Sequence, residues 1–172
     1  MTRAVMLSVF IMVACGHAPD PRTSSEAYEI CATALEAFAP TDSAVLRIAS
    51  QTQASPLISR VGDTSALYLG IQRDTGVGPE LLRSYDRANV KSIQLCNCFP
   101  KRVRVQLVSY TRRADVAGPV ELSNIAFNSD RSRALVEVSQ ICGRLCSSSN
   151  LYLVVRRRNG WQVSRPVLSG AS

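Results

Sequence analysis

Residues 127–163 decide the fold, and they read FNSDRSRALVEVSQICGRLCSSSNLYLVVRRRNGWQV. Apolar and polar side chains alternate over residues 132–141, with Ala134, Val136 and Val138 on one face. An alternation with a period of two residues predicts a half-buried strand of an antiparallel sheet.

Two further strands are expected after this one. Residues 151–155 form a continuous apolar run, and a turn at residues 158–160 leads the chain back into a strand that begins at Trp161. The stretch therefore predicts a meander of three antiparallel strands. Cys142 and Cys146 clip one end of it, and the only tryptophan lies near the other.

The register of the last hairpin has two solutions. A two-residue Asn-Gly turn pairs Arg158 with Trp161, whereas a three-residue loop with Gly160 in a left-handed conformation pairs Arg157 with Trp161. We prefer the second, because the apolar side chains then share one face: Leu151, Leu153, Val155, Trp161 and Val163. In that register Arg157 shares the face of Trp161, while Arg156 and Arg158 point the other way.

The meander resembles the C-terminal signature of a family of uncharacterised, exported bacterial proteins and lipoproteins. That signature has Phe-Asn, Ala-Leu-Val, Cys-Gly-x-x-Cys and Gly-x-Trp. The matching positions are Phe127, Asn128, Ala134, Leu135, Val136, Cys142, Gly143, Cys146, Gly160 and Trp161. The chain departs from the pattern at Ser147 and Ser149, where glycine is expected. The resemblance implies export and this strand arrangement. It gives no information about activity.

The N-terminus predicts export. Residues 1–14 combine a positive start with an apolar run that is too short to span a bilayer, as in a signal peptide. Residues 12–16 read MVACG and resemble the lipobox of bacterial lipoproteins, in which the cysteine, here Cys15, is diacylated. By the same resemblance, Gly16 implies sorting to the outer membrane in a Gram-negative organism. Cleavage after Ala18, which would give a secreted or periplasmic protein, is the alternative.

Residues 15–25 form a tether rich in Pro, Ser and Thr, and residues 26–172 form one domain. Caps, breakers and periodicity predict helices at 26–39 and 79–88, and strands at 45–52, 66–71, 103–110 and 121–127. This order predicts an α+β protein with N-terminal helices packed on a mainly antiparallel sheet. The specific expectation is a helix packed into a curved sheet, similar to cystatin-like or nuclear-transport-factor-like folds.

Five cysteines remain after the proposed lipid site, and an oxidising compartment favours disulfides between them. Cys142 and Cys146 flank a three-residue hairpin loop and should bond to each other. Cys31, on the apolar face of the first helix, is expected to bond to Cys96 or Cys98. A zinc site made from the last four cysteines is disfavoured, because the Cys-x-Cys spacing is too short. No metal or other cofactor is predicted.

The sequence contains few of the residues and motifs that are typical of catalytic sites. His17 is the only histidine, and it lies in the tether, so Ser-His-Asp, Cys-His and His-based metal chemistry are disfavoured. No phosphate-binding glycine loop with its lysine occurs. Paired carboxylates are the remaining option, with Asp63, Asp74, Glu121 and Glu137 as candidates.

Charge is distributed unevenly along the chain. Residues 15–89 carry six Arg and nine acidic residues, whereas residues 90–172 carry thirteen Lys or Arg and four acidic residues. Such a basic half can attract anionic lipid, lipopolysaccharide or acidic glycan. The candidate residues are Arg102, Arg104, Arg156 and Arg158. Nucleic acid is not expected, because the basic strands lack interleaved aromatic side chains.

Two functions remain. The first is a lipid-anchored cell-envelope protein that acts by binding or as a structural accessory, with a basic polyanion-binding face as its sharpest form. The second is an envelope hydrolase that uses carboxylates alone. The missing histidine and catalytic motifs favour the first.

Overall fold

A computed structural model describes residues 24–39, 45–54, 56–57, 64–110, 117–143 and 146–171. The expected signal peptide, the lipidation site Cys15, the alternative cleavage site after Ala18, most of the tether and Asp63 lie outside the described residues.

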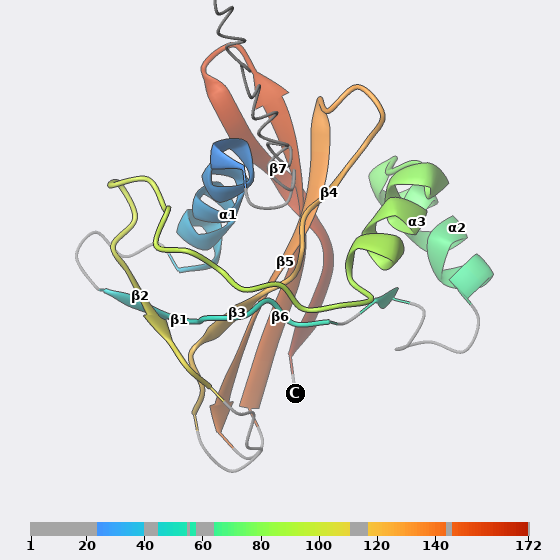
Figure 1. The fold of residues 1–172 in the computed structure, drawn as a ribbon. Coiled ribbons are helices and arrows are strands. Elements are labelled where there is room, and N and C mark those ends of the chain that lie inside the picture. The colour runs from blue at the N-terminus through green and yellow to red at the C-terminus, as the bar shows by residue number, and fades with distance from the viewer. Residues whose placement is uncertain are drawn as a thin grey trace, which may run out of the picture.

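Three helices and seven strands occur in the described part of the chain, which confirms the α+β class (Figure 1). The helices are α1 Ser25–Phe38, α2 Thr64–Thr75 and α3 Pro79–Ala88. The strands are β1 Leu46–Ala49, β2 Val105–Val108, β3 Val120–Leu122, β4 Ala126–Phe127, β5 Arg133–Gly143, β6 Cys146–Arg157 and β7 Gly160–Ala171.

The strands form one mixed sheet in the order β2-β1-β3-β5-β6-β7, with β4 paired to β5. The long antiparallel meander β5-β6-β7 is present as expected. However, β1 runs parallel to both of its neighbours, β2 and β3, so the expectation of a mainly antiparallel sheet is too simple. Parallel neighbours require a long crossover, and here the connection from β1 to β2 contains α2 and α3.

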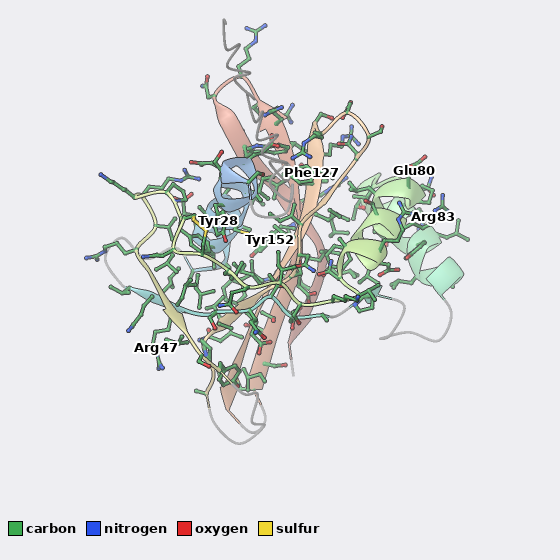
Figure 2. The ribbon with its side chains drawn as sticks, viewed as in Figure 1. Tyr28, Arg47, Glu80, Arg83, Phe127 and Tyr152 are labelled. Atoms are coloured by element: carbon green, nitrogen blue, oxygen red, sulfur yellow. A yellow bond between two sulfur atoms is a disulfide. The ribbon has the colours of Figure 1, made fainter. Side chains whose placement is uncertain are left out.

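Helices cover both faces of the sheet (Figure 1). On one face α1 packs on β5, β6 and β7, and Figure 2 shows Tyr28 and Tyr152 in the space between α1 and the sheet. We call this apolar layer the α1-side core; it includes Ile30, Leu35, Ile48, Val136, Val138, Val154 and the partly buried Trp161. The α3-side core on the opposite face includes Leu57, Leu82, Tyr85, Leu135, Leu151 and Leu153.

Strand β5 is buried on both faces and not half-buried as its alternation predicted. Val136 faces the α1-side core and Leu135 faces the α3-side core, and neither has any exposed surface. Glu137, on the second face, is only 1% exposed. The pattern identified the α1 face correctly, but it gave no sign that a second helical layer covers the other face.

Helices α1 and α3 begin where their capping signals place them. The Ser24 hydroxyl accepts a hydrogen bond from Ala27 N, 3.3 Å away, as an N-cap side chain does. Pro79 occupies the tolerated first turn of α3, and Leu82 and Tyr85 are fully buried.

The strand expected at residues 66–71 is wrong, because these residues belong to helix α2. Leu67, Tyr68 and Ile71 pack on the α3-side core, whereas Leu69 is 68% exposed. Positions i, i+1 and i+4 fall on one side of a helix and not of a strand. A short apolar run such as this one does not distinguish the two by periodicity.

The last hairpin adopts neither predicted register. Arg158 and Asn159 form a two-residue turn, Arg157 lies opposite Gly160, and Arg156 lies opposite Trp161. Gly160 does have the positive φ that was expected, at 110°. Tyr152 and Val154 therefore share a face with Trp161 and Val163, whereas the preferred register had assigned Leu151, Leu153 and Val155 to that face.

Candidate functional site

The clip at the tip of the β5–β6 hairpin is confirmed. Cys142 and Cys146 form a disulfide with their Cα atoms 5.1 Å apart. The bond closes a short loop, so its effect is to fix the hairpin tip.

The other cysteines pair differently from the prediction. Cys96 bonds to Cys98, and Cys31 forms no disulfide. Cys31 is buried in the α1-side core, whereas Cys96 and Cys98 lie in an exposed loop, so burial separates the partners that the sequence had suggested. Burial also raises the pKa of the Cys31 thiol to about 12. Within the described residues, no group of three or more potential metal ligands occurs.

The basic half of the chain contacts the acidic helix α1. Arg102 pairs with Glu29 and, at 3.0 Å, with Glu36. Arg156 pairs with Glu26 at 2.6 Å. Two of the four candidate polyanion-binding residues therefore already contact carboxylates, while Arg104 and Arg158 have exposed side chains and no ion pair among the described residues. Arg156, and not Arg157, shares the face of Trp161.

The candidate carboxylates lie in different environments. Asp74 is exposed and pairs with Arg73 at 2.9 Å. Glu137 is buried in β5, where Tyr85 Oη donates to Oε2 at 2.9 Å and Ser149 Oγ donates to Oε1. Glu121 of β3 is 7% exposed and lies on the same face of the sheet as Glu137.

This second face changes character along the strands. Where α3 covers it, β5 and β6 present leucines: Leu135, Leu151 and Leu153. Further along, the same face presents polar side chains on β3, β5 and β6, which we call the polar patch: Glu121, Glu137, Ser139 and Ser149. A sheet face that becomes polar while remaining buried calls for polar partners, because buried polar groups are costly when unpaired.

Ser139 is the member of the polar patch whose side-chain hydroxyl is unsatisfied. It is 6% exposed, and its Oγ has no hydrogen-bond partner among the described residues. Its Cα pairs directly with that of Glu121 across the β3–β5 ladder, so the two side chains are neighbours on one face.

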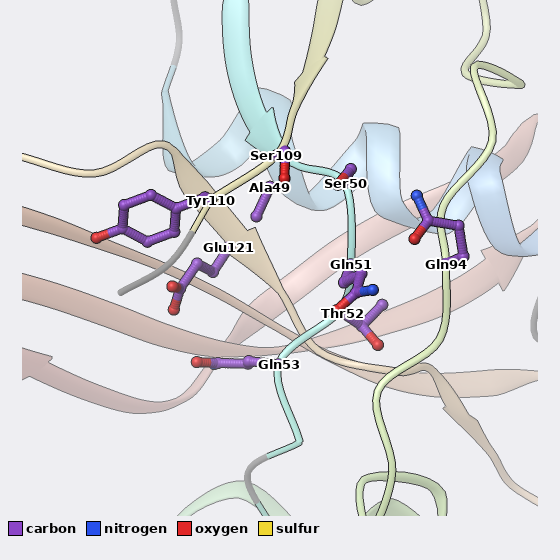
Figure 3. A pocket seen from close by; sticks show the side chains of 9 residues that line it. All are labelled: Ala49, Ser50, Gln51, Thr52, Gln53, Gln94, Ser109, Tyr110 and Glu121. Carbon is purple, nitrogen blue, oxygen red and sulfur yellow. The ribbon is translucent and has the colours of Figure 1, made fainter. Parts of the chain in front are cut away.

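A cavity of about 620 Å³ lies beside the polar patch, where β1 and β2 end (Figure 3). The described residues that line it are Ala49, Ser50, Gln51, Thr52, Gln53, Gln94, Ser109, Tyr110 and Glu121. One of these nine side chains is acidic and one is aromatic. The volume falls within the roughly 300–1,000 Å³ that is usual for small-molecule sites.

The chain that forms the cavity wall is held by its backbone. Residues 50–53 follow β1 directly; Gln51 bridges to Gln94, and Gln53 bridges to Ser123. Thr52 also belongs to a buried hydrogen-bond network, in which its Oγ1 donates to Asn124 Oδ1 at 2.7 Å. These contacts leave the glutamine side chains at the cavity surface while the backbone between them is fixed.

Asn124 connects this wall to α3. Its Nδ2 donates to the carbonyl oxygens of Ala88 and Lys91, each at 2.6 Å, and its backbone N donates to Asn89 Oδ1 at 2.7 Å. The cavity wall is therefore built on the end of α3 and does not depend on loop conformation alone.

Tyr110 is positioned by a glycine. A Cβ atom at Gly118 would lie 2.5 Å from Tyr110 Oη and 2.8 Å from its Cζ, so the ring approaches the backbone more closely than any other residue at 118 would allow. Gly118 N in turn donates to Ile141 O at 2.8 Å, next to the Cys142 clip. Figure 3 shows the ring beside Glu121 at one end of the cavity.

Of the described residues that line this cavity, only Glu121 was predicted as a candidate functional residue. The run Ser50-Gln51-Thr52-Gln53 directly after an apolar strand was the available signal, since polar side chains at strand ends often form binding sites. Residues 50–53 lie close to Gln94 and Tyr110 because of the strand order of the mixed sheet, which the sequence did not predict.

Comparison with known proteins finds no matching family model and no similar protein among the curated proteins or the solved structures. Among the described residues, no helix has both the length and the apolar character needed to cross a membrane.

Proposed function

We propose that this protein is a lipid-anchored component of the bacterial cell envelope that acts by binding a small polar ligand and not by catalysis. The observation that carries the proposal is the cavity of about 620 Å³ at the ends of β1 and β2. Its lining offers many hydrogen-bonding side chains on a backbone that is itself held by hydrogen bonds, so it can pair with the polar groups of a ligand.

The distribution of carboxylates supports binding over hydrolysis. A glycosidase needs two carboxyl groups about 5–9.5 Å apart on either side of the scissile bond. Among the described residues that line the cavity, Glu121 is the only carboxylate. Glu137 is nearby in the sheet, but it is 1% exposed and both of its oxygens accept hydrogen bonds from Tyr85 and Ser149. The hydrolase therefore remains the less supported alternative.

Location in the envelope rests on the sequence and on the disulfides. The lipobox-like residues around Cys15 indicate an anchor, and the Cys96–Cys98 and Cys142–Cys146 bonds suit an oxidising compartment. We propose the outer membrane in a Gram-negative organism, with a secreted or periplasmic form as the alternative.

A helix on one face of a sheet is also compatible with the cystatin-like or nuclear-transport-factor-like arrangement, which we keep as the finer fold proposal.

A polyanion-binding face on the sheet is a weaker form of the binding proposal. Of its four residues, Arg102 and Arg156 contact glutamates of α1, which leaves Arg104 and Arg158 to attract an anion. Exposed arginines of this kind supply weak and salt-sensitive attraction.

The test compares the wild-type protein with a variant whose cavity is filled. Full-length protein is incubated with a solubilised envelope fraction, separated by gel filtration, and its bound small molecules are identified by mass spectrometry. Gln51→Trp fills the cavity from an exposed position, and Gln162→Trp adds the same side chain to β7, away from the cavity.

We expect a compound that wild type and Gln162→Trp retain, that Gln51→Trp loses, and that is chemically unchanged after incubation. Equal retention by all three proteins would remove the cavity from the proposal. Conversion of the compound in a manner that Glu121→Gln abolishes would establish the hydrolase instead.

A further inference from the structure

We infer that the cavity binds an uncharged saccharide. This inference rests on the proposed binding function and names the ligand class of the same cavity. Its basis is the combination of amide, hydroxyl, carboxylate and aromatic side chains that the end of β1 brings together with β2, β3 and Gln94.

The lining is rich in groups that form hydrogen bonds. Three lining residues carry amides, and three carry hydroxyls besides Thr52, whose hydroxyl already bonds to Asn124 and Ile93: Gln51, Gln53, Gln94, Ser50, Ser109 and Tyr110. Amides and hydroxyls both donate and accept, as does every hydroxyl group of a sugar. An apolar ligand would cover these groups without pairing them, which costs binding free energy.

Charge also restricts the ligand. Among the described residues that line the cavity, Glu121 is the only one with an acidic or basic side chain. A phosphate or carboxylate group would be held next to Glu121, and no described lining residue is a cation that could offset the repulsion. The cavity therefore disfavours the acidic glycans and phosphates that the basic half of the chain suggested.

Glu121 and Ser139 are cross-strand neighbours on this face of the sheet. Glu121 already interacts within the protein, but a carboxylate has about four acceptor sites and can take further donors. Adjacent hydroxyl groups of a sugar ring are donors with a spacing that a carboxylate can accept. Ser139 Oγ has no hydrogen-bond partner among the described residues, but Ser139 is not one of the residues that line the cavity, so Glu121 is the member of this pair that contacts the ligand.

Tyr110 offers a stacking surface. Sugar rings have an apolar face of C–H groups, and the flat ring of a tyrosine provides a rigid apolar surface with a polar end. The missing side chain at Gly118 leaves room for this ring at one end of the cavity, beside Glu121 (Figure 3). A side chain at position 118 would force the Tyr110 ring to move.

The test uses full-length protein in a detergent that contains no sugar. The probes are chitotetraose and maltotetraose, which are neutral, and a heparin-derived tetrasaccharide, which is anionic. Binding is followed by amide chemical-shift changes in NMR spectra, which also report whether each variant is folded.

We expect one of the two neutral probes to shift amides of residues 50–53, 94 and 121. Gln94→Ala should weaken that binding by about fivefold and Glu121→Gln by about tenfold, because each removes hydrogen bonds to the ligand. Gly118→Ala should also weaken it, because the new methyl group displaces the Tyr110 ring. The matched control Gln162→Ala, an exposed glutamine on β7, should change affinity by less than about twofold.

Gln94 is exposed, so Gln94→Ala should fold even if Glu121→Gln does not. Three results would overturn the inference. These are no binding of either neutral probe at about 5 mM, equal binding by Gln94→Ala and Gln162→Ala, or a larger shift of the cavity amides with the anionic probe. If Gln51→Trp still loses an envelope compound that is not a saccharide, this inference fails while the proposed binding function stands.

Discussion

At the residue scale, Glu26 connects the N-terminal helix to the end of the meander. Its carboxylate accepts hydrogen bonds from Arg131 and Arg156, both at 2.6 Å. Arg131 also lies over the Phe127 ring, 4.0 Å from its centroid, and Arg156 lies 5.3 Å from the centroid of Trp161. Phe127 and Trp161 therefore have a structural role, because they contact the two arginines that hold α1 on the sheet.

Glu26→Gln should destabilise the protein measurably. The substitution keeps the shape of the side chain but leaves two arginines without their shared negative charge. Because the Glu26 side chain is 21% exposed and its partners are more exposed, we expect a loss of about 1–2 kcal/mol in the free energy of unfolding. Urea denaturation measures this loss. Glu36→Gln, which affects a more exposed pair, should cost less; equal losses would contradict the special role of Glu26.

Cys31 should make stability fall in mildly alkaline solution. Burial raises the pKa of its thiol from 9.0 to about 12, so above pH 9 the unfolded chain loses this proton while the folded chain keeps it. Stability is therefore fully present below pH 9 and declines as the pH rises towards 12. By pH 10 the loss should reach about 1–2 kcal/mol. Urea denaturation of wild type and Cys31→Ala between about pH 8 and pH 10 checks this; parallel curves for the two proteins would refute it.

At the element scale, the parts that the sequence predicted are those whose signals are local. Helix α1 has its serine cap, α3 has its proline in the first turn, and the meander has alternation and turn residues. The parts that failed depend on distant partners. The parallel pairing of β1, the helical state of α2 and the burial of Cys31 away from Cys96 and Cys98 are decided by which surfaces meet in the folded chain.

The candidate cavity belongs to this second group. Gln94 and Tyr110 join residues 50–53 only because β1 lies between β2 and β3 in the sheet. The sequence predicts Glu121 and Glu137 as candidate carboxylates. It does not indicate that Glu121 lines the cavity while Glu137 is buried. This difference comes from burial, since both carboxylate oxygens of Glu137 accept hydrogen bonds from Tyr85 and Ser149 in the interior.

The hairpin clip should contribute modestly to stability. Replacing both Cys142 and Cys146 by serine opens a short loop, which should cost about 2 kcal/mol by the chain-entropy account. The long β5–β6 ladder should keep the domain folded, because eight consecutive residues from Arg133 to Gln140 remain paired across it. Circular dichroism and urea denaturation test this expectation. Loss of the folded state would show that the clip is needed for the hairpin to form.

At the scale of the whole molecule, charge and architecture are linked. The chain carries a formal net charge of +7, and its acidic first half and basic second half meet where α1 lies on the sheet. Arg102, Arg131 and Arg156 of the basic half thus form ion pairs with glutamates of α1. The cavity opens on the opposite face of the sheet from α1, so a tether that leads into α1 would attach on the side away from the proposed ligand.

This arrangement makes the anchor a separate and testable part of the proposal. Cys15→Ser should move the protein from the membrane fraction to the soluble fraction and abolish incorporation of labelled palmitate. The cavity is formed by other residues, so ligand retention by the released protein should be unchanged. Cell fractionation, palmitate labelling and the retention assay measure the three effects.

Cys31→Ser is the matched control for the anchor, because it replaces a cysteine that is buried in the α1-side core and out of reach of an acyltransferase. It should keep both the label and the membrane location. Intact-mass measurement separates the two processing routes: an acylated chain that begins at Cys15 supports the anchor, whereas an unmodified chain that begins at Pro19 supports cleavage after Ala18. A Cys15→Ser protein that stays with the membrane would remove the lipoprotein proposal and leave the binding proposal to be judged on the cavity alone.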